Sequence, residues 1–229
     1  MPKKSNPWEV EVKETVTTTK HFLAGLSIKV RTDQFRLFKA QLKPTKESRV
    51  LDVGVTSDEI LKDSNMFEKL YDYPENITVA TIEDEKKFQK TYPEIRVVKI
   101  TPNSMLPFKN RQFDIAVSWA TLEHVGDYKK QEKFLNELLR VAKKIFITTP
   151  YRGCIYEPHT GFFFLHWLSL KWFRKICKIT GQVFWSKSEN LNPLYISDIK
   201  KMKLRSRVKV ITYSIFKILP SHIIISSEQ

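Results

Sequence analysis

The sequence predicts an α/β protein with a mostly parallel sheet and helices on both of its faces. Two observations lead to this prediction. Short apolar segments rich in β-branched residues alternate with longer amphipathic segments, which is typical of a chain that alternates strands and helices. The apolar segments also run on without alternating polar residues, as expected for strands that are buried on both sides.

Five apolar segments are predicted to be strands of this sheet. They are "RVLDVG" at residues 49–54 and the segments 77–82, 94–100, 113–119 and 145–149. Pro150 ends the fifth strand because proline cannot donate a ladder hydrogen bond. Towards the C-terminus, "RVKVITYSIF" and "SHIIISSEQ" predict two further strands that are joined by a turn at Pro220.

The segments between the strands predict helices. The clearest covers residues 127–143, where Phe134, Leu138 and Val141 follow helical spacing, Asp127 is a suitable cap, and Lys143 suits the negative end of the helix dipole. Further helices are predicted around "FRLFKAQL", ended by Pro44, over "NMFEKLY" with Asp63 or Ser64 as cap, over "DEKKFQKTY", through "FFFLHWLSLKWFRKICK", and over "DIKKMK" with Ser197 as cap.

Length and composition predict a single globular domain. The chain has 229 residues, of which 41% are hydrophobic and 28% charged. Within the domain we expect a helical N-terminal segment at 1–45, a core at 46–150, an aromatic and basic insertion at 151–195, and a final helix and strands at 196–229. The two cysteines cannot form a disulfide framework, and neither a signal peptide nor a bilayer-spanning segment is evident. A cytoplasmic location is therefore expected.

The net charge is +14, and much of it lies in one region. Between residues 171 and 209 there are eleven Lys and Arg against Glu189 and Asp198, so 11 − 2 = +9. This surplus indicates an anionic partner, such as nucleic acid, a phosphorylated substrate or a membrane surface. A solvated basic face is the equally simple alternative.

Polar side chains follow four of the predicted strands, and the carboxyl ends of parallel strands form a common ligand-binding edge. Glu83, after the second strand, is the most informative, because a carboxylate there can accept from both ribose hydroxyls of a nucleoside. It stands 83 − 54 = 29 positions after Gly54, whereas the usual gap is about 20. An ordinary solvated acid would fit the same position. The full set at this edge is Asp52, Gly54, Glu83, Asp84, Asn103, Ser104, Ser118, Trp119, Glu123 and His124.

Four segments together resemble a class I S-adenosylmethionine-dependent methyltransferase, with the greatest likeness to the type-eleven methyltransferase domain. They are "RVLDVG", "ITVATIED", "LPFKNRQFDIAVSWATLEHVGD" and "KFLNELLRVAKKIFITTP", and they cover residues 50–150. "EPHTGFFFLHWLS" further resembles a segment in a bacterial subgroup often associated with surface polysaccharide genes. The resemblance implies a Rossmann-like sheet of seven strands, with the last strand antiparallel, and S-adenosylmethionine as cofactor.

The resemblance also implies roles for the residues at the sheet edge. Asp52 would face the methionine ammonium, Gly54 would let the backbone approach the cofactor, and Glu83, with Asp84 beside it, would hold the ribose. Asn103 would meet the adenine, and Ser118 would line the methionine part. Val55, Thr56 and Ser57 replace the usual glycine-rich continuation of the loop. The hydroxyl of Thr56 would then supply a cofactor contact.

The acceptor side is expected in the insertion. His124 and His159 are the candidates for a general base, although His124 could equally brace its loop. Trp119, Glu157, His159 and Trp167 are the candidates for binding the acceptor, and packing against the sheet is the alternative for the aromatic residues. A hydroxyl of a small molecule, a glycan or a lipid-linked saccharide fits, with an anionic character that matches the basic segment. Peripheral contact with a membrane is also expected.

Other functions are less compatible with the sequence. The fourth strand ends in "SWATLEHV" rather than an Asn-Pro-Pro-Tyr type of sequence, which disfavours a DNA adenine methyltransferase. Neither a Walker loop nor a Gly-x-Ser-x-Gly elbow occurs. A non-catalytic cofactor-binding protein with an altered glycine-poor loop stays open. An RNA methyltransferase also stays open, although no separate RNA-binding module is found and nucleic acid is not the expected partner.

Overall fold

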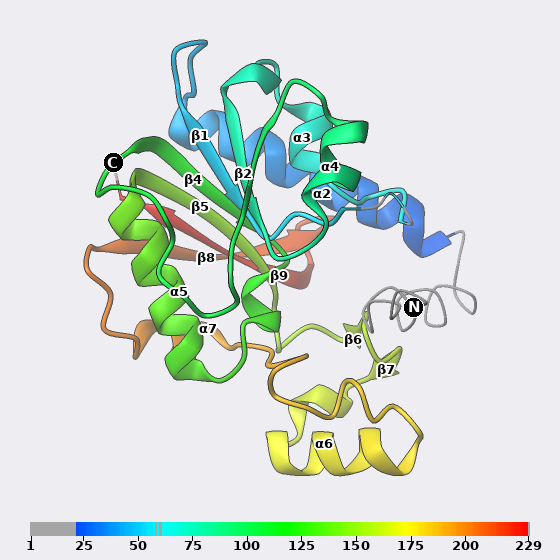
Figure 1. The fold of residues 1–229 in the computed structure, drawn as a ribbon. Helices are drawn as coiled ribbons and strands as arrows, with labels where there is room; N and C mark the ends of the chain where they lie inside the picture. The colour runs from blue at the N-terminus through cyan, green and yellow to red at the C-terminus, as the bar shows by residue number, and fades with distance from the viewer. Residues whose placement is uncertain (1–21, 58, 60, 229) are drawn as a thin grey trace, which may run out of the picture.

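The computed structural model describes residues 22–57, 59 and 61–228 (Figure 1). Its centre is a seven-stranded sheet in the order β3-β2-β1-β4-β5-β9-β8. The strands are β1 (Val50–Val53), β2 (Ile77–Thr81), β3 (Arg96–Lys99), β4 (Phe113–Trp119), β5 (Ala142–Pro150), β8 (Val208–Ile215) and β9 (Leu219–Ser227). Neighbours from β3 to β5 pair in parallel, whereas β9 pairs antiparallel with both β5 and β8. The predicted sheet, with its antiparallel last strand, is confirmed.

Helices cover both faces of the sheet (Figure 1). One face packs against α2 (Phe22–Leu42), α3 (Met66–Leu70) and α4 (Glu85–Thr91), through a core that includes Phe38, Phe67 and Phe88. The other face packs against α5 (Tyr128–Val141) and α7 (Ile196–Lys200), through Leu135, Leu138 and Ile199. The described residues also form three short 3₁₀ turns: η1 (Pro74–Asn76), η2 (Leu122–His124) and η3 (Leu165–Trp167). Among the described residues, no helix has the length and apolar character needed to cross a bilayer.

The insertion forms a small lobe at one end of the sheet, which we call the insertion lobe (residues 151–195; Figure 1). The prediction of one long helix through residues 162–178 is wrong for the first half of that segment. Phe162–Phe163 form β7, which pairs with β6 (Tyr156–Glu157), and only Leu170–Ile179 form a helix, α6. Between them Phe164 has a left-handed backbone with φ 59°, which no helix interior adopts. Ser169 caps α6 by accepting from Trp172 N.

Several predicted element ends are corrected by local hydrogen bonding. Lys143 and Lys144 belong to β5 rather than to α5, which ends at Val141. The cap of α3 is Asn65 instead of Asp63 or Ser64, and α7 begins after Tyr195, whose N–H donates to Asp198. Pro220 lies inside β9, so the turn between the last strands is at residues 216–218. The expected N-terminal helical segment is described only from Phe22, and residues 1–21 lie outside the described part.

Candidate active site

A cavity of about 580 Å³ lies at the carboxyl edge of the parallel strands. It is lined by the loop after β1, the ends of β2 and β3, the turn η2, and His159 and Trp185 from the insertion lobe. A smaller hollow of about 210 Å³ adjoins it and shares Arg31, Gly54 and Thr56 with it. Both lie beside β1 and β4, where the strand order reverses. This is the position at which open parallel sheets bind ligands.

The loop after β1 requires its single glycine. Gly54 has φ +105°, and a Cβ added there would lie 2.2 Å from Thr121 Oγ1. The N–H of Gly54 donates to Ala80 O at 3.0 Å, which ties the start of the loop to β2. Gly54 is therefore needed for its left-handed backbone and for the packing of Thr121, before any ligand is considered.

Glu83 holds the glycine-poor loop in place. Its Oε2 accepts from Ser57 N at 2.6 Å and from Thr56 Oγ1 at 3.3 Å. The Thr81 hydroxyl adds a bond to Val55 O at 2.9 Å. These bonds replace the compact glycine turn with a loop fixed by side chains. Both Thr56 and Glu83 line the large cavity, so the carboxylate that organises the loop also faces the ligand space.

Two acidic side chains are buried together at the smaller hollow. Asp52 and Glu68 are 3% and 5% exposed, and both line it. Burial, and then the neighbouring Glu68, raise the pKa of Asp52 well above its usual value. Burial also raises the pKa of Glu68 to about 7, although its hydrogen bond with Asp52 acts in the opposite direction. Like charges in a buried site disfavour double ionisation, so the pair holds a proton near neutral pH.

The same hollow presents two buried hydrogen-bond donors. Arg31 Nη1 and Trp119 Nε1 find no hydrogen-bond partner among the described residues, and both side chains line the hollow. Arg31 reaches it from α2, where its Nε lies 4.0 Å from Asp63 Oδ2. Buried donors without partners are costly, so this hollow is suited to a ligand with an acceptor such as a carboxylate.

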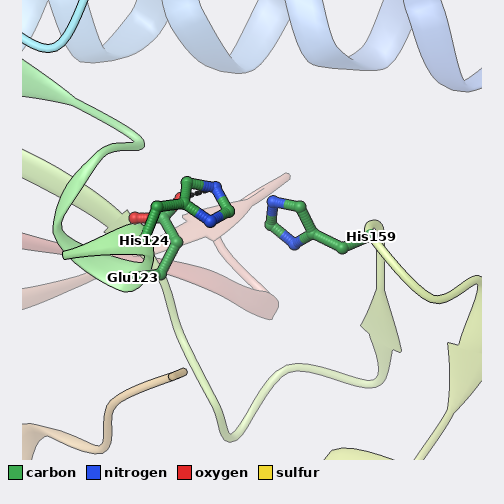
Figure 2. Close-up of side chains that lie close together, drawn as sticks. All are labelled: Glu123, His124 and His159. Atoms are coloured by element: carbon green, nitrogen blue, oxygen red, sulfur yellow. Dashed lines mark ion pairs between the residues drawn. The ribbon is translucent and has the colours of Figure 1, made fainter. Parts of the chain in front are cut away.

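His124 and His159 meet in the wall of the large cavity beside the buried Glu123, and Figure 2 shows the two imidazoles turned towards each other. His124 Nδ1 lies 2.6 Å from Asn190 O, and His159 Nδ1 lies 2.6 Å from Glu157 Oε1. Burial lowers the pKa of His124. Although burial opposes it, the charge of Glu157 raises the pKa of His159. Burial alone would raise the pKa of Glu157. The charge of His159 outweighs this effect and holds the pKa of Glu157 at about 2.

The structure divides the predicted site residues into three groups. The large cavity is lined by Gly54, Thr56, Glu83, Asn103, Ser104, His124 and His159. The smaller hollow is lined by Asp52, Gly54, Thr56 and Trp119. The remaining five line neither: Asp84, Ser118, Glu123, Glu157 and Trp167.

Local contacts explain this third group. Asp84 caps α4 by accepting from Lys86 N and Lys87 N. Ser118 is fully buried and donates to Val53 O at 2.7 Å, which joins β4 to β1. Trp167 donates from Nε1 to Cys154 O within the insertion lobe and is 47% exposed. Glu157 stands behind His159 and positions it.

Sequence reasoning missed four residues that line these spaces: Arg31, Glu68, Thr121 and Trp185. Arg31 and Glu68 lie on helices, where a charged side chain usually indicates a solvated face. The informative signal for Glu68 is its place directly after buried Met66 and Phe67 in a short helix.

Comparison with known proteins identifies the fold and the family. Residues 51–145 match the family described as a methyltransferase domain. This segment belongs to the methyltransferase domain family. The match confirms the resemblance of residues 50–150 to a methyltransferase domain and, with it, S-adenosylmethionine as the cofactor. None of the curated proteins matches the sequence.

Solved structures share the fold of this chain at low sequence identity. A protein from Pyrococcus horikoshii is 11% identical with a TM-score of 0.59, and the match covers 98% of this chain and 100% of that one. A possible histamine N-methyltransferase from Thermotoga maritima is 14% identical with a TM-score of 0.54, covering 96% and 97%. Magnesium protoporphyrin IX methyltransferase from Synechocystis, with bound SAH, is 10% identical with a TM-score of 0.54, covering 96% and 94%.

The donors and acceptors at the sheet edge fit the cofactor of this family. The unpaired donors of Arg31 and Trp119 suit its carboxylate, and the carboxyl groups of Asp52 and Glu68 beside them suit its ammonium group. Glu83 and Asn103 offer acceptors in the adjoining cavity, which also has apolar wall residues such as Leu106 and Phe134. The glycine-poor loop leaves both spaces open.

Proposed function

We propose that this methyltransferase transfers a methyl group from S-adenosylmethionine to a hydroxyl of a small molecule, a glycan or a lipid-linked glycan. The observation that carries the proposal is the continuity of the site. The large cavity extends from the loop after β1 to His124 and His159. The loop after β1 is where we expect the cofactor in a sheet of this kind. A single cavity can therefore bring an acceptor against the cofactor and exclude water from both.

The cofactor is held at the sheet edge in this proposal. Glu83 accepts from the ribose hydroxyls through its remaining acceptor capacity, and Asn103 meets the adenine. Arg31 and Trp119 bind the carboxylate of the methionine part, while Asp52 and Glu68 bind its ammonium group. The cofactor supplies an already activated methyl group, so the protein has only to align the acceptor, and this contributes about 7–11 kcal/mol in well-oriented reactions.

The acceptor lies on the side of the insertion lobe. His124 and His159 are the groups of the cavity wall that suit binding or deprotonating a hydroxyl, and such a base contributes about 10²–10⁴-fold. Trp185 packs 5.1 Å from His159, centroid to centroid, and offers an apolar surface for the rest of the acceptor. Lys130 and Lys133 at the cavity rim favour an anionic acceptor.

The experiment follows the methyl label into the product. The full-length protein is incubated with S-adenosylmethionine labelled in its methyl group and with fractionated small molecules, glycolipids, polysaccharides and RNA. We expect label in one of the first three fractions, stable to mild base, because a methyl ether resists base while a methyl ester does not. Label that nuclease releases from RNA would contradict the proposal, and so would label that mild base releases.

The control for this experiment is a pair of neighbouring acids. Glu83→Gln should weaken binding of S-adenosylhomocysteine by about 1–3 kcal/mol, roughly 5- to 150-fold, because a charged acceptor of the ribose hydroxyls is lost. Asp84→Asn keeps an acceptor for the cap of α4 and should bind within about twofold of the native protein. Titration calorimetry measures both. Equal affinities for the two variants would remove Glu83 from the cofactor site, and a native protein that does not bind would favour a non-catalytic protein.

A further inference from the structure

We infer that Glu123, His124 and His159 form a binding site for a divalent transition-metal ion of the Zn²⁺ type. Each offers one ligand atom, and these atoms all lie within 4.8 Å of one another (Figure 2). The ligand atoms of a tetrahedral Zn²⁺ ion lie about 3.4 Å apart, so the widest pair here needs to close by up to about 1.4 Å. His124 Nε2 and Glu123 Oε1 are already 3.6 Å apart. The cluster joins two segments, the turn η2 and the loop after β6.

Hydrogen bonds orient both imidazoles for this role. Asn190 O can only accept, so the Nδ1 of His124 carries the proton and the lone pair lies on Nε2. The carboxylate of Glu157 fixes His159 in the same way, and Glu157 is held by Thr160 N and Thr160 Oγ1, each at 2.7 Å. A histidine that ligates a metal usually donates its other N–H to a carbonyl or a carboxylate. Both histidines show this arrangement.

The third ligand is a buried carboxylate, one oxygen of which lacks a hydrogen-bond partner among the described residues. Glu123 is 0% exposed, and its Oε2 accepts from Thr149 Oγ1 at 2.9 Å. Its Oε1 has no hydrogen-bond partner among the described residues and points towards the imidazoles (Figure 2). A buried acceptor of this kind is unfavourable unless it is paired, and a metal ion would satisfy it.

The donor set indicates both the metal and its use. Two imidazole nitrogens and one carboxylate oxygen are the ligands of catalytic zinc sites, which leave a further position open. His124 and His159 line the large cavity, so the open position faces the acceptor space. The role of the ion rests on the proposed function. A hydroxyl bound to such an ion loses its proton to water at lower pH than a free hydroxyl. His159 then holds the ion through Nε2 and does not itself take the proton.

The metal itself is the probe in the test. The full-length protein, freed of any histidine tag and treated with chelator, is titrated with Zn²⁺ by calorimetry and with Co²⁺ by visible absorption. We expect one ion per chain. The d–d bands of bound Co²⁺ should disappear when excess Zn²⁺ replaces it, because Zn²⁺ has a filled d shell. His159→Gln and Glu123→Gln should each weaken binding at least about tenfold. His222→Gln, on β9 and outside the cluster, should bind like the native protein.

Binding of S-adenosylhomocysteine is measured for every variant, because retained binding shows that the fold is intact. A native protein that binds no stoichiometric ion would overturn the inference, as would cluster variants that bind as tightly as the His222 variant. If the ion binds and the chelated protein transfers methyl groups at the full rate, the catalytic use is overturned and the site stands. Loss of cofactor binding in the native protein would instead contradict the proposed function, and the metal titration does not depend on it.

Discussion

Glu68 links the protonation of the site to the stability of the protein. Its carboxyl group is buried beside Asp52, and burial raises its pKa from its usual 4.5 to about 7. The folded state therefore binds more protons than the unfolded state between these two values. Stability must then fall as the pH rises from about 4.5 through about 7, because ionisation of Glu68 is easier in the unfolded chain.

Glu68→Gln should remove most of this pH dependence. Between pH 5 and 8 the free energy of unfolding of the native protein should fall by about 1–3 kcal/mol more than that of the variant. Urea unfolding at a series of pH values measures the difference. Glu94→Gln, an exposed acid ahead of β3, is the matched control and should keep the native slope. If both variants keep that slope, Glu68 ionises normally in the folded protein.

Among the elements, α6 has two faces of different character. Phe173 and Cys177 face inward and form a small core with Trp185 and Leu191. Trp172 and Ile179 are 55% and 73% exposed. Lys175 Nζ lies 5.0 Å from the centre of the Trp172 ring, and Lys171 and Lys178 are also exposed. Arg174 is not part of this outer face, since its Nη2 donates to Asn192 Oδ1 at 2.8 Å. An apolar surface beside lysines suits an anionic lipid or glycolipid.

The outer face of α6 should therefore bind anionic vesicles. Replacing Trp172 and Ile179 together by Ser should lower the bound fraction at least about tenfold, because burying each large apolar side chain contributes about 1.5–3 kcal/mol. Cosedimentation with vesicles of anionic or neutral lipid measures the effect. Ile218→Ser, at the equally exposed turn between β8 and β9, is the control. If that change lowers binding as much, or neutral vesicles bind equally well, the outer face of α6 has no such role.

In the whole molecule, Arg152 holds together separate segments of the insertion lobe just after the end of β5. Its Nε donates to His166 O at 2.9 Å and its Nη2 to Leu168 O at 2.6 Å. Its backbone N–H donates to Leu194 O, and the guanidinium lies 4.8 Å from the centre of the Tyr195 ring. Arg152 thus connects the start of the lobe to its middle and to its C-terminal end.

Arg152→Ala should loosen the lobe while the sheet persists. The lost bonds to two carbonyls should lower the free energy of unfolding by about 2–4 kcal/mol. Methyl transfer should fall more than affinity for S-adenosylhomocysteine, because the lobe carries the acceptor side in our proposal. Denaturant unfolding, calorimetry and label transfer report these three quantities. Arg96→Ala, on the edge strand β3, should leave all three near native values. A cofactor affinity that falls as far as the activity would contradict the division of roles.

Sequence patterns predicted the sheet well because a continuous apolar segment is a local signal for a buried strand. The segment 113–119 coincides with β4, and the antiparallel last strand was expected from the family resemblance. The insertion was predicted poorly because its aromatic run lacks a periodicity that separates β7 from α6. At the site, His124 and His159 were recognised singly, while their meeting with Glu123 depends on how the lobe packs. Arg31 comes from α2, which no local pattern connects to the sheet edge.

The placement of β9 determines how late the sheet can be completed. It is the last strand of the chain and lies between β5 and β8, with Ile223, Ile224 and Ile225 fully buried. Until β9 arrives, β5 presents an open apolar edge and β8 has no neighbour to pair with. Contacts between residues so far apart in sequence form slowly, and open strand edges in folding intermediates promote aggregation. During synthesis, the chain therefore exposes an open strand edge until β9 is made and pairs with β5 and β8.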